Sequence, residues 1–182
     1  MVTNAIKNKS QRLFDMMDEN RNGVISAKDL QLTAERLIDA FGVAESAKAR
    51  QVINSYTKVW EELAAQADTD GDGQISRAEF ESAFAGADQG KGLQAINRAI
   101  DAEFELADSD GDGMLSRDEL SRMLRAFRVP QSELDTAVAA LDQDGDGQVS
   151  AEEYRAAMRE FYLSDDLTTP GSQLLGRIRA AV

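Results

Sequence analysis

One twelve-residue pattern occurs four times in this chain, beginning at Asp18, Asp68, Asp108 and Asp142. The pattern is Asp-x-(Asp/Asn)-x-(Asp/Asn)-Gly-x-(Ile/Val/Leu)-Ser-x-x-(Glu/Asp), and its copies read DENRNGVISAKD, DTDGDGQISRAE, DSDGDGMLSRDE and DQDGDGQVSAEE. Repetition of a short segment indicates a fold that is assembled from copies of one supersecondary unit. The four copies are referred to below as loops one to four.

The segments on either side of each loop have the apolar spacing of amphipathic helices. The chain has only two prolines, and Ala, Leu, Glu, Lys, Arg and Gln dominate between the loops, which favours helix. The sequence therefore predicts an all-α, compact globular fold in which four helix–loop–helix units form two pairs. Around loop one the apolar positions are Leu13, Phe14, Met17, Leu30, Leu37, Ile38 and Phe41.

Glycine marks the expected breaks between these units. The stretch 86–92 is rich in glycine and polar residues, so we place the boundary between the two pairs there. We also expect the residues after loop four to fold back on the core. The expected units are 1–86 with loops 18–29 and 68–79, 93–163 with loops 108–119 and 142–153, and a tail at 164–182.

Two local signals predict where individual helices begin. Gly42 predicts a break that is followed by a long helix through Trp60. After Pro130, Ser132 and Asp135 resemble an acidic variant of the capping box, which predicts a helix that starts at Ser132.

The spacing of oxygen-bearing residues within each loop is typical of a calcium site. Ca²⁺ takes roughly six to eight oxygen ligands at about 2.3–2.6 Å, and a short loop delivers them from positions one, three, five, seven and twelve. Position seven uses its backbone carbonyl, so its side chain is unrestricted. The predicted ligands are Asp18, Asn20, Asn22, Val24 and Asp29; Asp68, Asp70, Asp72, Gln74 and Glu79; Asp108, Asp110, Asp112, Met114 and Glu119; and Asp142, Asp144, Asp146, Gln148 and Glu153.

Three other positions of the pattern support the same interpretation. Glycine at position six permits the positive φ of a sharp turn. The apolar residue at position eight is expected to pair with the partner loop in a short ladder. Serine at position nine is expected to act on the metal through water. The position-eight and position-nine residues are Ile25, Ile75, Leu115, Val149, Ser26, Ser76, Ser116 and Ser150.

Charge distinguishes loop one from the others. Loops two to four each carry four ligand carboxylates, whereas loop one carries only Asp18 and Asp29. Asp29 is one methylene shorter than glutamate, which weakens calcium binding relative to the smaller Mg²⁺. We therefore expect three or four bound Ca²⁺ ions, with loop one the weakest site or one that holds Mg²⁺. The alternative is that the loops are acidic surface turns without metal.

Composition excludes several other functions. The absence of cysteine and histidine removes disulfides, thiolate nucleophiles, imidazole bases and most zinc or copper sites. The formal net charge of −13 disfavours nucleic acid and anionic membranes as partners. No nucleophile motif or phosphate-binding glycine loop is present, so we expect no enzymatic activity. The polar N-terminus and the lack of long apolar runs predict a cytoplasmic protein, which we expect to be monomeric.

With its four loops in place, the chain resembles the calerythrin and sarcoplasmic calcium-binding protein group of the EF-hand family. The resemblance rests on the unequal linkers, on the ending of loop one at Asp29, and on the tail from 161 to 176. It implies two paired hands, a C-terminal segment that folds back, and a role in buffering or transporting calcium. Members commonly have a degenerate second loop, whereas here Asp68, Asp70, Asp72, Gly73 and Glu79 are intact.

A calcium buffer and a calcium sensor remain the two functional hypotheses. A sensor opens an apolar, often methionine-rich groove when it binds metal, and then grips a partner helix. The methionines here are scattered, and the tail leucines are placed to plug such a groove, which favours a buffer. A dockerin-like adhesion module fits less well, because complete helices precede the loops. Tyr56, Trp60 and Phe84 are expected in the core, although they would also suit a ligand pocket.

Overall fold

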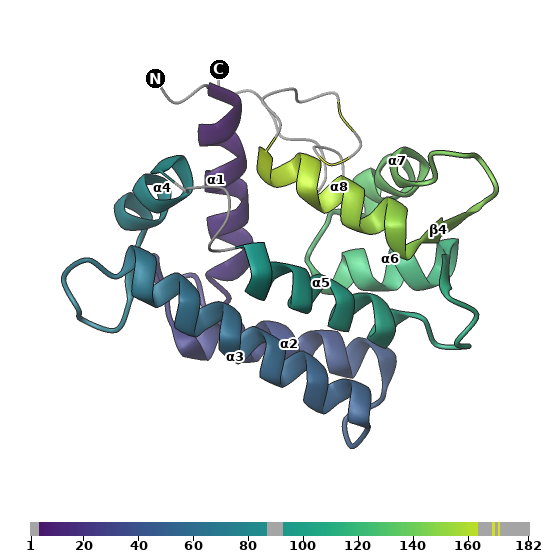
Figure 1. Ribbon diagram of the computed structural model, residues 1–182, viewed down its shortest axis with the longest axis horizontal. Coiled ribbons are helices and arrows are strands. Elements are labelled where there is room, and N and C mark those ends of the chain that lie inside the picture. Colours follow the sequence, from purple (N-terminus) through teal and green to yellow (C-terminus); the bar gives the residue numbers. More distant parts are fainter. Residues whose placement is uncertain (1–3, 87–92, 164–168, 170, 172–182) are drawn as a thin grey trace.

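The structure is a computed structural model that describes residues 4–86, 93–163, 169 and 171 (Figure 1). Its strands are two or three residues long, and helices form almost all of the remaining regular structure, which confirms the all-α prediction. The elements are α1 (Asn4–Met17), β1 (Val24–Ile25), α2 (Ala27–Phe41), α3 (Ala47–Ala67), β2 (Ile75–Ser76), α4 (Arg77–Gly86), α5 (Leu93–Ala107), β3 (Met114–Ser116), α6 (Arg117–Ala126), α7 (Gln131–Leu141), β4 (Gln148–Ser150) and α8 (Ala151–Leu163).

The predicted break at Gly42 is confirmed. Gly42 ends α2 with φ of 68°, and its N–H donates to the carbonyls of Ile38 and Asp39. A left-handed residue at this position is the usual way to satisfy the last carbonyls of a helix, and glycine adopts it without a Cβ penalty. Ser46 then caps α3, because its Oγ accepts from the N–H of Ala49 at 2.9 Å. The 21-residue helix α3 is the long helix that the sequence predicts.

The helix predicted after Pro130 is confirmed, but the predicted capping box is not formed. Helix α7 begins at Gln131, and Pro130 occupies the cap position without a side-chain cap. Proline fixes φ near the helical value, so the chain enters the helix directly after it. Asp135 takes no part in a capping box and instead forms an ion pair with Arg117 of α6, at 2.8 Å.

Short antiparallel ladders join the loops in pairs, as position eight predicts. Ile25 of β1 lies opposite Ile75 of β2, and Leu115 of β3 lies opposite Val149 of β4. All four side chains are buried, since the most exposed of them has only 1% of its surface accessible. The apolar residue at position eight therefore anchors each loop to the core.

One hydrophobic core runs through both halves of the molecule. It contains buried residues from every described helix, and α3 of the first half packs along α5 of the second (Figure 1). Helix α2 also contacts α6 across the same boundary. Within the first half, the rings of Phe14 and Phe80 meet edge to face, with centroids 5.7 Å apart. The two pairs of units thus share one core. Of the expected linker at 86–92, Gly86 ends α4 and the other residues lie outside the described residues, so the domain limits stay a prediction.

A buried carboxyl group lies where the halves meet. Glu103 of α5 has 6% of its surface exposed. Tyr56 of α3 donates its hydroxyl to Oε1 of Glu103 at 2.8 Å, and Tyr154 of α8 donates to Oε2 at 3.2 Å. Burial raises the pKa of Glu103 to about 7, although the two tyrosine hydrogen bonds lower it in part. Removing a carboxylate from water is costly unless it is fully paired, which explains the direction of this shift.

Because the pKa of Glu103 is raised in the folded protein, we expect the free energy of unfolding to depend on pH. The folded protein holds the Glu103 proton more tightly than the unfolded chain, whose glutamates titrate near 4.5. The stability that the neutral carboxyl contributes is therefore complete below pH 4.5 and is lost as the pH rises to about 7. The loss between about pH 5.5 and pH 8 should be about 2 kcal/mol.

The measurement is urea unfolding of calcium-saturated protein across that pH range, with Glu103→Gln as the test variant. The chain has no histidine, so few other groups titrate there. The variant should have a flatter profile than the parent, because its amide has no proton to lose. Glu105→Gln on the exposed side of α5 is the matched control and should keep the parental slope. Parallel profiles for the parent and Glu103→Gln would contradict this role.

Candidate metal sites

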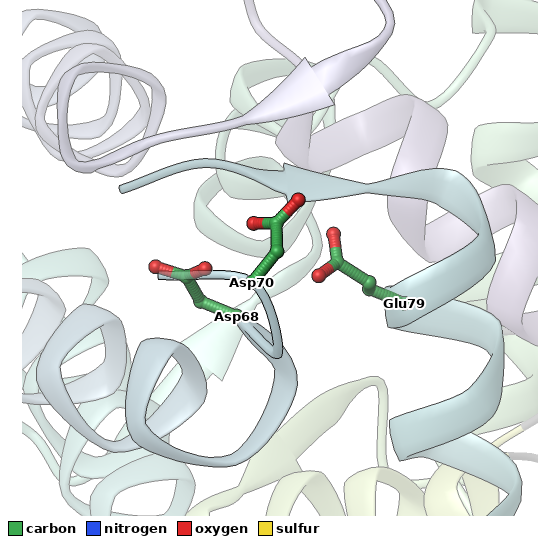
Figure 2. Close-up of side chains that lie close together, drawn as sticks. All are labelled: Asp68, Asp70 and Glu79. Carbon is green, nitrogen blue, oxygen red and sulfur yellow. The ribbon is translucent and has the colours of Figure 1, made fainter. Parts of the chain in front are cut away.

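Carboxylates from loops two, three and four gather into three clusters among the described residues. In each cluster, one carboxylate oxygen from each of positions one, three and twelve lies within 4.8 Å of the other two. Figure 2 shows loop two, where Asp68 and Asp70 come from the loop and Glu79 reaches toward them from the first turn of α4. The clusters are Asp68, Asp70 and Glu79; Asp108, Asp110 and Glu119; and Asp142, Asp144 and Glu153.

The glutamate at position twelve joins the two ends of its loop. Its Oε1 accepts from the N–H of the loop's second residue, at 3.0 Å for Glu79, 2.8 Å for Glu119 and 2.9 Å for Glu153. Its Oε2 accepts from the N–H of the serine at position nine, at 2.9, 2.9 and 2.8 Å in the same order. Hydrogen bonds within the loop therefore hold the glutamate carboxylate between the second and ninth residues.

These hydrogen bonds keep the glutamates ionised. Those from the backbone and side chain of Ser76, followed by those from Thr69, lower the pKa of Glu79 to about 2. At Glu119 and Glu153, burial raises the pKa, but hydrogen bonds from the neighbouring serines and backbone groups outweigh burial and lower the pKa of both. Hydrogen-bond donors that stabilise the charged form lower the pKa of a carboxyl group. All three carboxylates are thus negatively charged at neutral pH, as a hard divalent cation requires.

The serine at position nine has a role that the sequence interpretation did not include. In loop three, Ser116 accepts from the N–H of Glu119, while Glu119 accepts from the N–H of Ser116, forming a complete capping box at the start of α6. The serine hydroxyls of loops two to four also donate to the glutamate Oε2, at 2.7, 2.7 and 2.8 Å. The Ser-x-x-Glu spacing was the signal for this arrangement. The proposed water-mediated contact to metal stays a prediction.

The aspartates at position five are not members of these clusters. Asp72, Asp112 and Asp146 each accept from the N–H of the residue at position seven, at 2.8 Å. Position one accepts from the N–H of the glycine at position six, at 3.0 Å in each of these loops. These bonds curl the backbone around the carboxylates. Gln74 directly precedes β2, whereas Val24, Met114 and Gln148 begin their strands, and the carbonyl ligation expected of them stays a prediction.

Loop one is built differently. Asp18 and Asp29 are buried, with 5% and 0% of their surfaces exposed. Oδ1 of Asp29 accepts from the N–H of Asn20 at 3.3 Å, one residue further along the loop than in the other three. Arg21 has φ of 58° at the position where the other loops have glycine. A side chain in the left-handed region costs roughly 1–2 kcal/mol, so this loop is both less charged and more strained. Asn22 accepts from the N–H of Val24 at 3.0 Å.

Residues from the opposite half of the molecule contact two of the loops. Lys48 of α3 donates its Nζ to the carbonyl of Asp108, the first residue of loop three, at 2.6 Å. Glu19 in loop one forms an ion pair with Arg128 of the second half, which precedes α7, and another with Arg36 of α2 in its own half. Lys48 and Asp108 lie 60 residues apart, and Arg128 and Glu19 lie 109 apart. These residues are too far apart in the chain for a local sequence pattern to predict that they pair.

In the described part of the chain, no helix combines the length and the apolar character needed to cross a lipid bilayer. No protein in a search of curated sequences matches this chain. Solved structures do match. A calcium-binding protein from Streptomyces coelicolor is 32% identical, with a TM-score of 0.77, and the match covers 86% of this chain and 97% of that one.

Two more distant structures have the same fold. A sarcoplasmic calcium-binding protein from amphioxus is 21% identical over 97% of this chain and 98% of its own length, with a TM-score of 0.75. Apo-berovin, a photoprotein from a ctenophore solved with magnesium in its calcium-binding loops, is 19% identical, with a TM-score of 0.68 and coverage of 90% and 89%.

A family model agrees with the site geometry. The model described as an EF-hand domain pair matches residues 7–85 and again residues 96–159, so each match contains two of the four loops. The three carboxylate clusters occur in three of these loops. This chain therefore belongs to the EF-hand family of calcium-binding proteins, and it has the fold of the sarcoplasmic members.

Proposed function

We propose that this protein is a calcium buffer that binds and releases Ca²⁺ in the cytoplasm as a monomer. The observation that carries the proposal is the set of three carboxylate clusters, each closed by a glutamate whose pKa is held low by backbone and serine donors. The ligands at each loop are those predicted from the sequence, with positions five and seven completing the oxygen shell. Four bound Ca²⁺ ions would change the formal net charge from −13 to −5.

The burial of apolar residues supports a buffer over a sensor. Among the described residues, Ile53 is the single large hydrophobic residue that is exposed, with 40% of its surface accessible. The apolar faces of the two halves are already packed against each other in one core. A sensor instead needs an apolar groove that opens to a partner. The described residues expose no large apolar surface of that kind.

One described residue of the tail lies against the core. Gly171 packs so closely on α8 that a Cβ at this position would lie 2.0 Å from the carbonyl oxygen of Ala157. Its N–H donates to Oε2 of Glu160 at 3.3 Å. These contacts support a tail that returns to the core. The leucines and isoleucine expected to plug the core, Leu167, Leu174, Leu175 and Ile178, lie outside the described residues, as does the side chain of Leu163.

A calcium sensor is the second candidate. The Streptomyces coelicolor protein is described in terms of prokaryotic calcium-mediated regulation, and it is the relative reported above that shares 32% of its sequence with this chain. Lys48 contacts loop three and Arg128 contacts loop one. Through these contacts, a conformational change at either loop would be transmitted to the opposite half. In a sensor, such a change would separate α3 from α5.

Calcium should raise the thermal stability of the protein. Bringing three carboxylates together costs free energy, and a bound cation offsets their repulsion. At a calcium concentration about 100 times the Kd, each site should add about 2.7 kcal/mol to the free energy of unfolding. Differential scanning calorimetry with calcium and with chelator measures this difference. The combined variant Glu79→Gln, Glu119→Gln and Glu153→Gln should lose most of it, and coincident parental melting curves would refute the proposal.

The length of the side chain at position twelve should determine the order of calcium affinity among the loops. Asp29→Glu should strengthen calcium binding at loop one by about tenfold, because the longer side chain reaches the ion with both oxygens. The reciprocal change, Glu119→Asp, should weaken loop three by about the same factor and shift its preference toward Mg²⁺. Isothermal titration with Ca²⁺, with and without millimolar Mg²⁺, resolves the affected site. If Glu119→Asp alters the weakest site of the parent protein, the ranking is wrong.

Binding of an apolar dye separates the buffer from the sensor. A buffer should bind 8-anilinonaphthalene-1-sulfonate less when calcium is added, because metal tightens a core that is already closed. Fluorescence is compared in calcium and in chelator, with potassium chloride at matched ionic strength as the control. A rise in dye fluorescence with calcium, together with calcium-dependent binding of a purified amphipathic helix, would instead support the sensor.

A further inference from the structure

A cavity of about 100 Å³ lies between the two halves of the molecule. Helices α1, α2, α3, α5, α6 and α8 contribute to its wall, and Figure 1 shows these helices in both halves of the molecule. Most of the lining is apolar, and it includes flexible methionine side chains as well as rigid branched ones. Representative lining residues are Met16, Leu30, Val59, Ile100, Leu124 and Met158.

Polar atoms converge at one part of this wall. Glu103, Tyr56 and Tyr154 all line the cavity, and the two tyrosine hydroxyls donate to the two oxygens of the glutamate. Each carboxyl oxygen has a second lone pair, so the group can accept a further hydrogen bond. An apolar pocket with a few converging polar groups is the usual form of a small-molecule site.

The metal sites give no reason for a carboxyl group at this position. Glu103 precedes loop three by five residues and belongs to none of the carboxylate clusters. An apolar residue of similar volume would fill the same space without the cost of removing a carboxyl group from water. A buried polar group that costs stability and lines a cavity is a typical feature of a binding site.

Size and chemistry narrow the class of ligand. An engineered apolar cavity of about 150 Å³ holds benzene, so a cavity of about 100 Å³ with adjustable methionines suits a single aromatic ring. Methionine sulfur also makes favourable contacts with aromatic rings. The apolar wall disfavours a charged ligand, whereas the Glu103 oxygens favour one that brings a hydrogen-bond donor.

We propose that the cavity between the two halves binds a small, uncharged aromatic molecule whose single O–H or N–H group donates to Glu103. Such a ligand contacts helices of both halves at once. None of the predicted calcium ligands lines the cavity, although Leu30 and Tyr154 directly follow the position-twelve residues Asp29 and Glu153. Binding of such a ligand is therefore a function additional to calcium buffering. Its test does not depend on whether the protein acts as a buffer or as a sensor.

The test compares phenol with toluene, which has nearly the same shape but no donor. Each is titrated into calcium-saturated, full-length protein and followed by NMR of the protein methyl groups. Phenol should bind at one saturable site with a Kd on the order of 1 mM, as expected for a ligand of this size. Toluene should bind about tenfold more weakly, because it leaves the carboxyl oxygen without the extra partner.

Two variants locate the site. Ala99 lines the cavity, so Ala99→Leu should fill it and abolish phenol binding. Glu103→Leu should remove the preference for phenol over toluene. Glu105→Gln, on the exposed side of the same helix, should bind phenol as the parent does. Calcium stoichiometry and circular dichroism establish that each variant is folded.

The comparison of the two ligands on the parent protein holds even if a variant fails to fold. Saturable phenol binding that is stronger than toluene binding supports the proposal. Absence of saturable phenol binding would overturn it, and so would equal affinity for the two ligands. Phenol binding that persists in a folded Ala99→Leu protein would place the site elsewhere and also overturn it.

Discussion

Carboxylate groups held close together repel one another, and the metal loops of this protein depend on how that repulsion is contained. In loops two to four, oxygens from positions one, three and twelve lie within 4.8 Å. The glutamate at position twelve keeps its place because donors at both ends of the loop bind its two oxygens. The same donors lower its pKa, so it stays charged where a cation needs it. Short ladders between buried residues such as Leu115 and Val149 then fix the loops in pairs.

The two halves are joined by packing and by polar contacts. A single core extends through both, and Glu103 receives hydrogen bonds from tyrosines on either side of the boundary. Lys48 and Arg128 extend this linkage to loops three and one. Loops three and one are therefore in direct contact with residues of the opposite half. The hydrogen-bonded cluster of Glu103, Tyr56 and Tyr154 lines the cavity between the halves, where we propose a small ligand binds.

Much of the candidate site follows from local chemistry. A glycine with positive φ, such as Gly113, acidic residues at alternate positions and a terminal glutamate form a loop of the same shape wherever they occur together. That is why the clusters lie where the spacing predicts them. The interpretation of Ser116 was incomplete, because its hydroxyl serves the helix start as well as the loop. The capping box predicted after Pro130 is not formed, because the fixed φ of proline outweighed a weak capping signal.

The sequence by itself determined the repeated unit, the helices around it and the carboxylates that gather at its loops, because these depend on residues a few positions apart. Only the tertiary structure decided that the halves share one core, that Lys48 contacts Asp108, and that Glu103 lies with two tyrosines beside a cavity. These features join residues that are distant in the chain. Their spacing carries no periodic signal, since it is set by how the helices pack once they have formed.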